Sequence, residues 1–172
     1  MRGELLAIMG PSGSGKTTLL DILAHRKTSN NATIRKSIYL NGNATTDVEL
    51  RQISAYVEQE EALTGALTVE ETLYFAAKLS LPSSISKTER LQRIQDLLTA
   101  FGLADQANTL IGTPIRKGIS GGQKRRVSVA SQLITNPRIL FLDEPTSGLD
   151  STASFEVMSF VRQIVKQHNV RK

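Results

Sequence analysis

A glycine-rich segment at residues 10–17 constrains the fold of this chain more than any other stretch. It reads GPSGSGKT, follows the apolar run at residues 5–9, and leads into residues 18–23, which have helical composition. Strand, G-x-x-x-x-G-K-[ST] and helix is the order in which a phosphate-binding loop occurs. Its glycines let backbone N–H groups point inward, and the helix N-terminus adds positive potential. The segment therefore predicts a nucleotide site rather than a flexible connector.

Two side chains of this segment are expected to contribute chemistry. Lys16 should reach the β- and γ-phosphates, and the Thr17 hydroxyl should ligate Mg²⁺. The loop residues that we expect to bind nucleotide are Gly10, Pro11, Ser12, Gly13, Ser14, Gly15, Lys16, Thr17 and Thr18.

Composition narrows the class of protein. A length of 172 residues, 40% hydrophobic and 22% charged, suits one globular domain with a core. The chain has no cysteine, which excludes disulfides and thiolate metal sites, and no apolar run is long enough to cross a membrane. The net charge of +5 is spread along the chain, so it does not by itself indicate nucleic acid.

Strand and helix signals alternate along the rest of the chain. Strands are expected at residues 37–40, 53–57 and 139–142, the first ending in an Asn41-Gly42 hairpin turn and the last buried on both faces. Residues 47–52 suit a short helix or a loop. Capping boxes at residues 68–71 and 86–89 begin two helices; a third should span residues 120–135 and a fourth should follow Asp150. This alternation predicts a layered α/β fold.

Some side chains can be assigned to the core or to solvent. The last helix is expected to turn Phe155, Met158, Val161 and Val165 inward. Solvent exposure is the simplest interpretation of His25 and Lys27, and a solvated face that of Lys124, Arg125 and Arg126.

A second group of polar residues lies far from the glycine-rich loop in sequence. Asp143 and Glu144 follow the apolar strand at residues 139–142, at the strand end where parallel α/β sheets bind ligands. Beside a phosphate loop, Asp143 is expected to hold Mg²⁺ and Glu144 to polarise the attacking water. The four residues Ser120, Gly121, Gly122 and Gln123 begin a helix and predict a second anion-binding terminus.

Together these motifs resemble the ATP-binding cassette of ABC ATPases. In chain order they are Walker A (10–17), the Q-loop glutamine Gln59, the signature (119–123), Walker B (139–143, with Glu144) and the D-loop (147–150). The amino-acid sequences of residues 67–73, 118–130 and 141–151 resemble those of the G subfamily. This subfamily includes White-type half-transporters and pleiotropic drug resistance pumps. The resemblance covers essentially the whole chain.

The resemblance implies an α/β P-loop NTPase with a mostly parallel sheet flanked by helices and an inserted α-helical subdomain. Residues 1–66 and 121–172 would form the core, and residues 67–120 the subdomain that carries the signature. Such domains dimerise head to tail around ATP and Mg²⁺, so Ser120, Gly121, Gly122 and Gln123 would contact ATP held by a partner copy. Lys16, Gln59 and Glu144 would be catalytic, and Thr17, Gln59 and Asp143 would hold the metal.

The same resemblance implies a transmembrane domain as partner, a location at the cytoplasmic face of a membrane, and no nucleic acid. Family features that have no counterpart here are the strands that precede the one leading into Walker A, an adenine-stacking aromatic residue and the switch histidine, which His168 does not match. We therefore expect a fragment with weak or no hydrolysis on its own. A soluble ABC ATPase acting on ribosomes or nucleic acid, and a nucleotide-dependent interaction module without efficient hydrolysis, are the alternatives.

Overall fold

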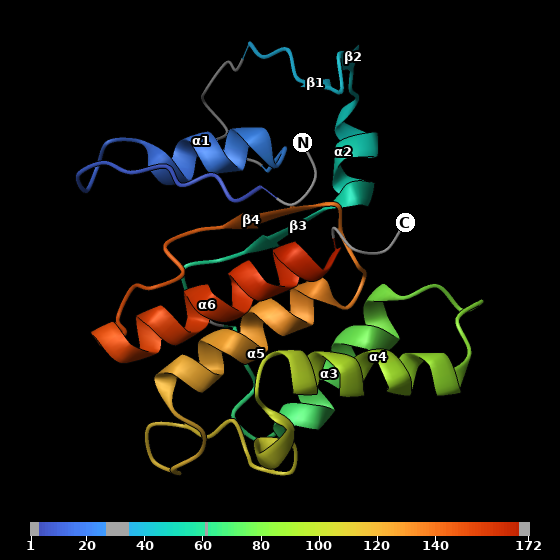
Figure 1. Cartoon of the computed structure of the whole chain (residues 1–172), viewed down its shortest axis with the longest axis vertical. Helices are drawn as coiled ribbons and strands as arrows, with labels where there is room; N and C mark the ends of the chain where they lie inside the picture. The colour runs from blue at the N-terminus through green and yellow to red at the C-terminus, as the bar shows by residue number, and fades with distance from the viewer. Residues whose placement is uncertain (1–3, 27–34, 61, 169–172) are drawn as a thin grey trace.

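The computed structural model describes residues 4–26, 35–60 and 62–168. Its helices and strands alternate only in part, because three helices follow one another in the middle of the chain (Figure 1). In chain order the elements are α1 (Lys16–Leu23), β1 (Tyr39–Leu40), β2 (Asn43–Ala44), α2 (Asp47–Ile53), β3 (Ser54–Val57), α3 (Val69–Ser80), α4 (Lys87–Ala100), the 3₁₀ turn η1 (Ala104–Gln106), α5 (Gly121–Leu133), β4 (Ile139–Leu142) and α6 (Ser151–His168).

The parallel pair β3 and β4 brings the middle of the chain beside its last third. Ser54 pairs with Ile139 and Val57 with Leu142. The ladder extends past the strand end, where the Asp143 N–H donates to the Val57 carbonyl at 3.0 Å. In Figure 1 this pair runs between α1 and the helices α5 and α6. The strand expected at residues 139–142 is thus parallel to its neighbour β3, and it delivers Asp143 to the end of the sheet.

The other strand pair is the expected hairpin. β1 and β2 are antiparallel, and Asn41 (φ 51°) and Gly42 (φ 85°) between them both adopt the left-handed backbone that a two-residue hairpin turn requires. The Asn-Gly prediction is confirmed, and the segment at residues 47–52 is a helix, α2.

The sheet is smaller than expected. Among the described residues it consists of two separate two-stranded sheets rather than one mostly parallel sheet. The apolar run at residues 5–9 was expected to be a strand, but it is not one. Leu6 is 85% exposed and Met9 90%. A strand needs a neighbour to bond its backbone, and this run has no strand partner among the described residues.

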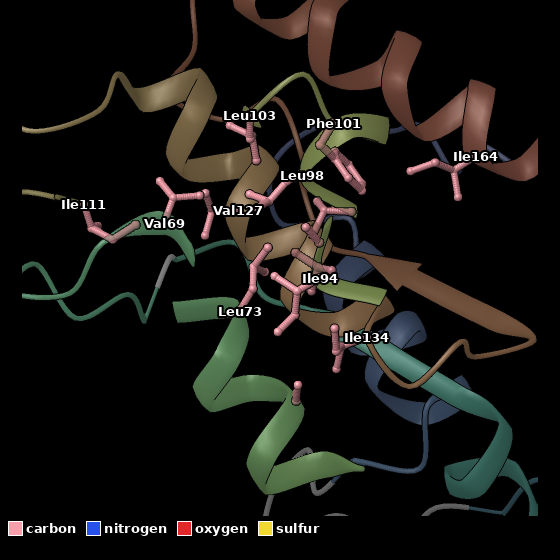
Figure 2. Packing of buried hydrophobic residues seen from close by; sticks show 14 of the residues in the cluster. Val69, Leu73, Ile94, Leu98, Phe101, Leu103, Ile111, Val127, Ile134 and Ile164 are labelled. Carbon is pink, nitrogen blue, oxygen red and sulfur yellow. The ribbon is translucent and has the colours of Figure 1, made fainter. Parts of the chain in front are cut away.

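The best-packed part of the molecule is formed by α3, α4, α5 and α6. Figure 2 shows the side chains that meet between these elements, and α5 packs against both α3 and α6. Completely buried side chains with no exposed surface include Leu73, Ile94, Leu98, Phe101, Leu103 and Val127. Burial of a Leu, Ile or Phe side chain is worth about 1.5–3 kcal/mol, so this cluster is the main source of stability. The boundaries of the helical subdomain at residues 67 and 120 remain a prediction.

Helix starts follow the predicted capping residues. The Thr68 and Ser120 side chains accept from the N–H groups of Glu71 and Gln123, and both capping boxes are reciprocal. Ser86 accepts from the N–H of Glu89, and Asp150 accepts from the N–H of Ala153 at 2.8 Å. Gly102, with φ 59°, follows the C-cap residue of α4, Phe101, in the left-handed backbone common after helix ends.

Two predictions about burial were wrong. β4 is half-buried along its length rather than enclosed on both faces. On α6, Phe155 is 74% exposed, whereas Val157, Val161 and Ile164 are buried. Of the expected inward set only Val161 is fully buried, while Met158 and Val165 are half-buried. The helical spacing predicted that α6 has an apolar face, but not which side of the helix is turned inward. The contact with α5 decides that side.

Candidate nucleotide site

The glycine-rich loop is shaped by its own backbone. Gly13 (φ 79°) and Gly15 (φ 86°) are both in the left-handed region, and the Ser14 N–H donates to the Pro11 carbonyl. A Cβ on Gly10 would lie 2.7 Å from the Ser14 hydroxyl, so a larger residue there would force the Ser14 side chain to move. Gly15 caps α1 without a side-chain hydrogen bond. The first amides of α1 thus have no side-chain cap, as expected of a helix N-terminus that receives an anion.

Lys16 folds back over this loop. Its ammonium donates to the carbonyls of Gly10 and Pro11 at 3.0 and 2.9 Å. The positive charge of Lys16 therefore lies against the loop backbone. Its predicted contact with phosphate oxygens is consistent with this position.

Thr17 joins the loop to the end of β4. Its hydroxyl donates to Asp143 Oδ1 at 3.0 Å, although the two residues are far apart in the sequence. The Tyr56 hydroxyl donates to the other oxygen, Oδ2, at 3.2 Å. Asp143 is buried, and burial together with the charge of Asp143 raises the pKa of the Tyr56 phenol. Both carboxylate oxygens therefore have a donor that fixes their orientation.

Gln59 and Glu144 form the neighbouring pair. The Gln59 side-chain amide donates to Glu144 Oε2 at 2.9 Å and lies 3.4 Å from the Ser147 hydroxyl. Glu144 itself has φ 43°, in the left-handed region that a residue other than glycine rarely adopts. Backbone strain of this kind is concentrated at functional sites, which supports a chemical role for this carboxylate.

The donor set near the loop fits a magnesium ion shared with a nucleotide. No group of three or more histidine or acidic side chains that could hold a metal occurs in the described part of the chain. Mg²⁺ commonly takes only one or two protein ligands and completes its octahedron with phosphate oxygens and waters. The Thr17 hydroxyl and the Asp143 carboxylate are oxygen ligands of that type, and they already lie together.

The signature residues lie elsewhere. Ser120 caps α5, which lies on the other side of the β3–β4 pair from α1 in Figure 1. Gly122 is buried, and a Cβ there would be 3.0 Å from that of Ala153 on α6, so this glycine allows close helix packing. No hydrogen bond between described residues joins these signature residues to the loop. The structure thus gathers Lys16, Thr17, Gln59, Asp143 and Glu144, and leaves Ser120, Gly121, Gly122 and Gln123 apart.

Two arginines predicted on a solvated face are in fact buried. Arg125 donates to the carbonyls of Glu58 and Gln59. Arg126 donates to the Phe101 carbonyl at 3.0 Å, and its guanidinium lies 4.9 Å from the centre of the Phe160 ring. Only Lys124 keeps a partly exposed side chain. Charge composition alone suggested solvent, and the signal that was missed is the apolar sequence that follows on the same helix.

His25 was also misplaced by the prediction. It is 5% exposed, and its Nδ1 contacts Lys36 and Asp47. Burial and the Lys36 charge lower the pKa of this imidazole. Together with Tyr39 and Thr45 these residues line a pocket of about 260 Å³ between α2 and the hairpin. Lys27 lies outside the described residues.

Comparison with known proteins gives consistent matches. A family model described as "ABC transporter" matches residues 1–147. ABC transporter G family member 1 of Dictyostelium discoideum is 48% identical over 95% of this chain and 21% of its own length. G family member 17 of Arabidopsis thaliana is 46% identical over 98% of this chain and 25% of its own length. The chain thus spans about a fifth to a quarter of these relatives.

A solved structure matches the fold. It is described as the dimeric post-hydrolysis state of the ATP-binding cassette MJ0796 bound to ADP and Pi. It is 30% identical with a TM-score of 0.72, and the match covers 98% of this chain and 72% of that one. No helix within the described ranges is long and apolar enough to cross a bilayer.

Proposed function

The chain belongs to the ABC transporter family, and on this premise we propose that it binds ATP with Mg²⁺ and hydrolyses it as the motor domain of a membrane transporter. The observation that carries the proposal is the hydrogen bond between the Thr17 hydroxyl and Asp143. It brings the phosphate loop to the end of the strand that also supplies Glu144. Two segments distant in sequence thereby form one site of the composition that phosphoryl transfer requires.

Each residue has a definable task in this reaction. The loop amides and Lys16 bind the phosphates, and Thr17 and Asp143 would hold Mg²⁺, which would neutralise charge that develops on those phosphates. Glu144 accepts the proton of a water that attacks the γ-phosphorus, and the bond from that phosphorus to the β–γ bridging oxygen breaks to leave ADP and phosphate. Gln59 contacts Glu144 directly, so it can orient that carboxylate and the water beside it.

The separate position of the signature residues supports a site completed by a second domain. Ser120, Gly121, Gly122 and Gln123 begin a helix that lies on the other side of the β3–β4 pair from α1. Helix N-termini bind anions, so we expect these residues to contact the ATP that a partner cassette holds. The matching structure of the MJ0796 cassette is described as dimeric, which supports a second cassette as partner. The G family relatives further support a transmembrane domain as partner and a position at the cytoplasmic face of a membrane.

The first test is removal of the loop lysine. Lys16→Ala should weaken binding of a fluorescent ATP analogue by at least about 100-fold, because charge-assisted hydrogen bonds to the phosphates are lost. The matched control is Lys78→Ala on α3, where an exposed lysine is removed without touching the site. Equal affinity of wild type and Lys16→Ala, by fluorescence titration, would exclude the phosphate-loop assignment.

The second test separates binding from chemistry. Glu144→Gln should retain ATP affinity but lower turnover by about 10²–10⁴-fold, the usual contribution of a general base. Phosphate release is to be measured in whichever form of the protein shows turnover. Wild-type turnover in Glu144→Gln would remove this residue as the base while leaving ATP binding intact.

A further inference from the structure

Arg125 is a buried side chain that reaches from α5 to the segment holding the candidate glutamine. It is 3% exposed. One terminal nitrogen donates to the Glu58 carbonyl at 2.9 Å, and the other donates to the Gln59 carbonyl at 2.7 Å. Two successive peptide groups are therefore held by one guanidinium.

This contact is geometrically demanding. A guanidinium is planar and presents its N–H groups in a rigid fork, so two bonds to neighbouring carbonyls fix both distance and direction. A buried cation is also expensive to leave unsatisfied, which ties the position of the carbonyls to that of the arginine. The backbone position of Glu58 and Gln59 therefore depends on α5 as well as on β3, the strand that precedes them.

The backbone position decides where the Gln59 side chain points. Both residues are exposed beyond the end of β3, where the Glu58 side chain pairs with Arg26 while the Gln59 backbone carbonyl accepts from Arg125. The Gln59 side-chain amide donates to Glu144 at 2.9 Å. We propose that Arg125 is a positioning residue that holds Gln59 against Glu144. For its effect on hydrolysis this inference rests on the proposed function.

The placement of Arg125 has a consequence for communication within the dimer. The helix that carries it, α5, begins at the signature residues, which we expect to contact the partner's ATP. A shift of α5 when that nucleotide binds would move the Gln59 backbone through the guanidinium. One rigid helix would then link occupancy of the partner's site to the chain's own glutamine.

The variants are chosen to separate positioning from general stability. Arg125→Met removes both donors, whereas Arg125→Lys keeps the charge and length but loses the fork. The control is Arg126→Lys, because Arg126 is a buried arginine on the same helix that bonds Phe101 and not the glutamine segment. If Arg125→Met does not fold, the test is made with Arg125→Lys alone. Circular dichroism shows whether each variant is folded.

The measurement is ¹⁵N NMR of the nucleotide-free chain, so it does not depend on ATP binding. We expect the Gln59 backbone order parameter to fall from about 0.85 to below about 0.6 in both Arg125 variants and to stay unchanged in Arg126→Lys. Glu144→Gln should shift the Gln59 side-chain amide signal in the wild type but not in Arg125→Lys. Where turnover is measurable, kcat should fall about tenfold in Arg125→Lys at unchanged KM, corresponding to one charged hydrogen bond.

Two results would overturn the inference. One is a Gln59 order parameter and side-chain signal that are the same in folded Arg125→Lys as in the wild type. The other is an equal fall of the Gln59 order parameter in Arg126→Lys, which would mean that Arg125 has only the general structural role that any buried arginine of α5 has. Neither result bears on whether Lys16→Ala abolishes nucleotide binding, so a failure here is distinguishable from a failure of the proposed function.

Discussion

The phosphate loop and the helical part of the molecule are built in different ways. No residue of α1 is fully buried, and residues 4–15 are exposed. In contrast, α3 and α4 with the turn after them contain Leu73, Ile94, Leu98 and Phe101 with no exposed surface. The loop is specified by glycine backbone geometry, which needs no core, whereas the helices are held by long-range packing. A binding loop can thus be present where there is little packing to stabilise it.

Polar contacts join the two regions. Thr17 bonds Asp143, and the Arg26 guanidinium pairs with Glu58 and lies 4.3 Å from the centre of the Tyr56 ring. Tyr56 in turn bonds Asp143. The loop and α1 are therefore attached to β3 and β4 partly through Thr17 and Asp143, which belong to the candidate site, and partly through Arg26, Glu58 and Tyr56 beside it.

The largest difference between the regions should appear in stability. Phe101→Ala should lower the free energy of unfolding by about 3–5 kcal/mol, because it removes a buried ring and leaves a cavity. Leu6→Ala, in an 85% exposed side chain, should change it by less than about 0.5 kcal/mol. Urea unfolding followed by circular dichroism measures both. A comparable loss in Leu6→Ala would mean that residues 5–9 are packed in solution.

A smaller effect is expected where the regions meet. Thr17→Val removes the hydrogen bond to Asp143 and should cost about 1 kcal/mol, with faster amide exchange in α1 than in α3. Thr18→Val is the matched control, because Thr18 is an exposed neighbour with no side-chain hydrogen bond to Asp143. Hydrogen exchange by mass spectrometry distinguishes the two. Identical exchange in both variants would show that the Thr17–Asp143 contact does not hold α1 in place.

What the sequence predicted well is encoded locally. Capping boxes gave the helix starts at Thr68 and Ser86, the Ser-Gly-Gly segment gave the start at Ser120, and an Asn-Gly pair gave the hairpin. The approach of Thr17 to Asp143 was also expected, because a phosphate-loop hydroxyl and a carboxylate at a strand end together supply oxygen ligands for Mg²⁺.

What the sequence did not predict depends on tertiary neighbours. The apolar run at residues 5–9 has strand composition, but composition does not supply the adjacent strand that it needs. Arg125 and His25 are polar, yet both are buried. Arg125 donates hydrogen bonds to backbone carbonyls of a distant segment, and His25 contacts the side chain of Lys36. Which partner a polar side chain will meet cannot be obtained from its own neighbours in the chain.

The smallest effect concerns His25, which lies where the loop region meets α2. Lys36, Asp47 and Arg51 act on the imidazole, and burial with the Lys36 charge lowers its pKa below the ordinary value of 6.5. The unfolded chain then binds a proton more readily than the folded one, so this contribution to stability is complete above about pH 6.5 and is lost as pH falls through the lowered pKa. Urea unfolding between about pH 7.5 and 5 should show a decline that is shallower in His25→Asn. If acidification destabilises both proteins equally, His25 is not the titrating group. Its imidazole is then more exposed to solvent than its contacts with Lys36 and Asp47 indicate.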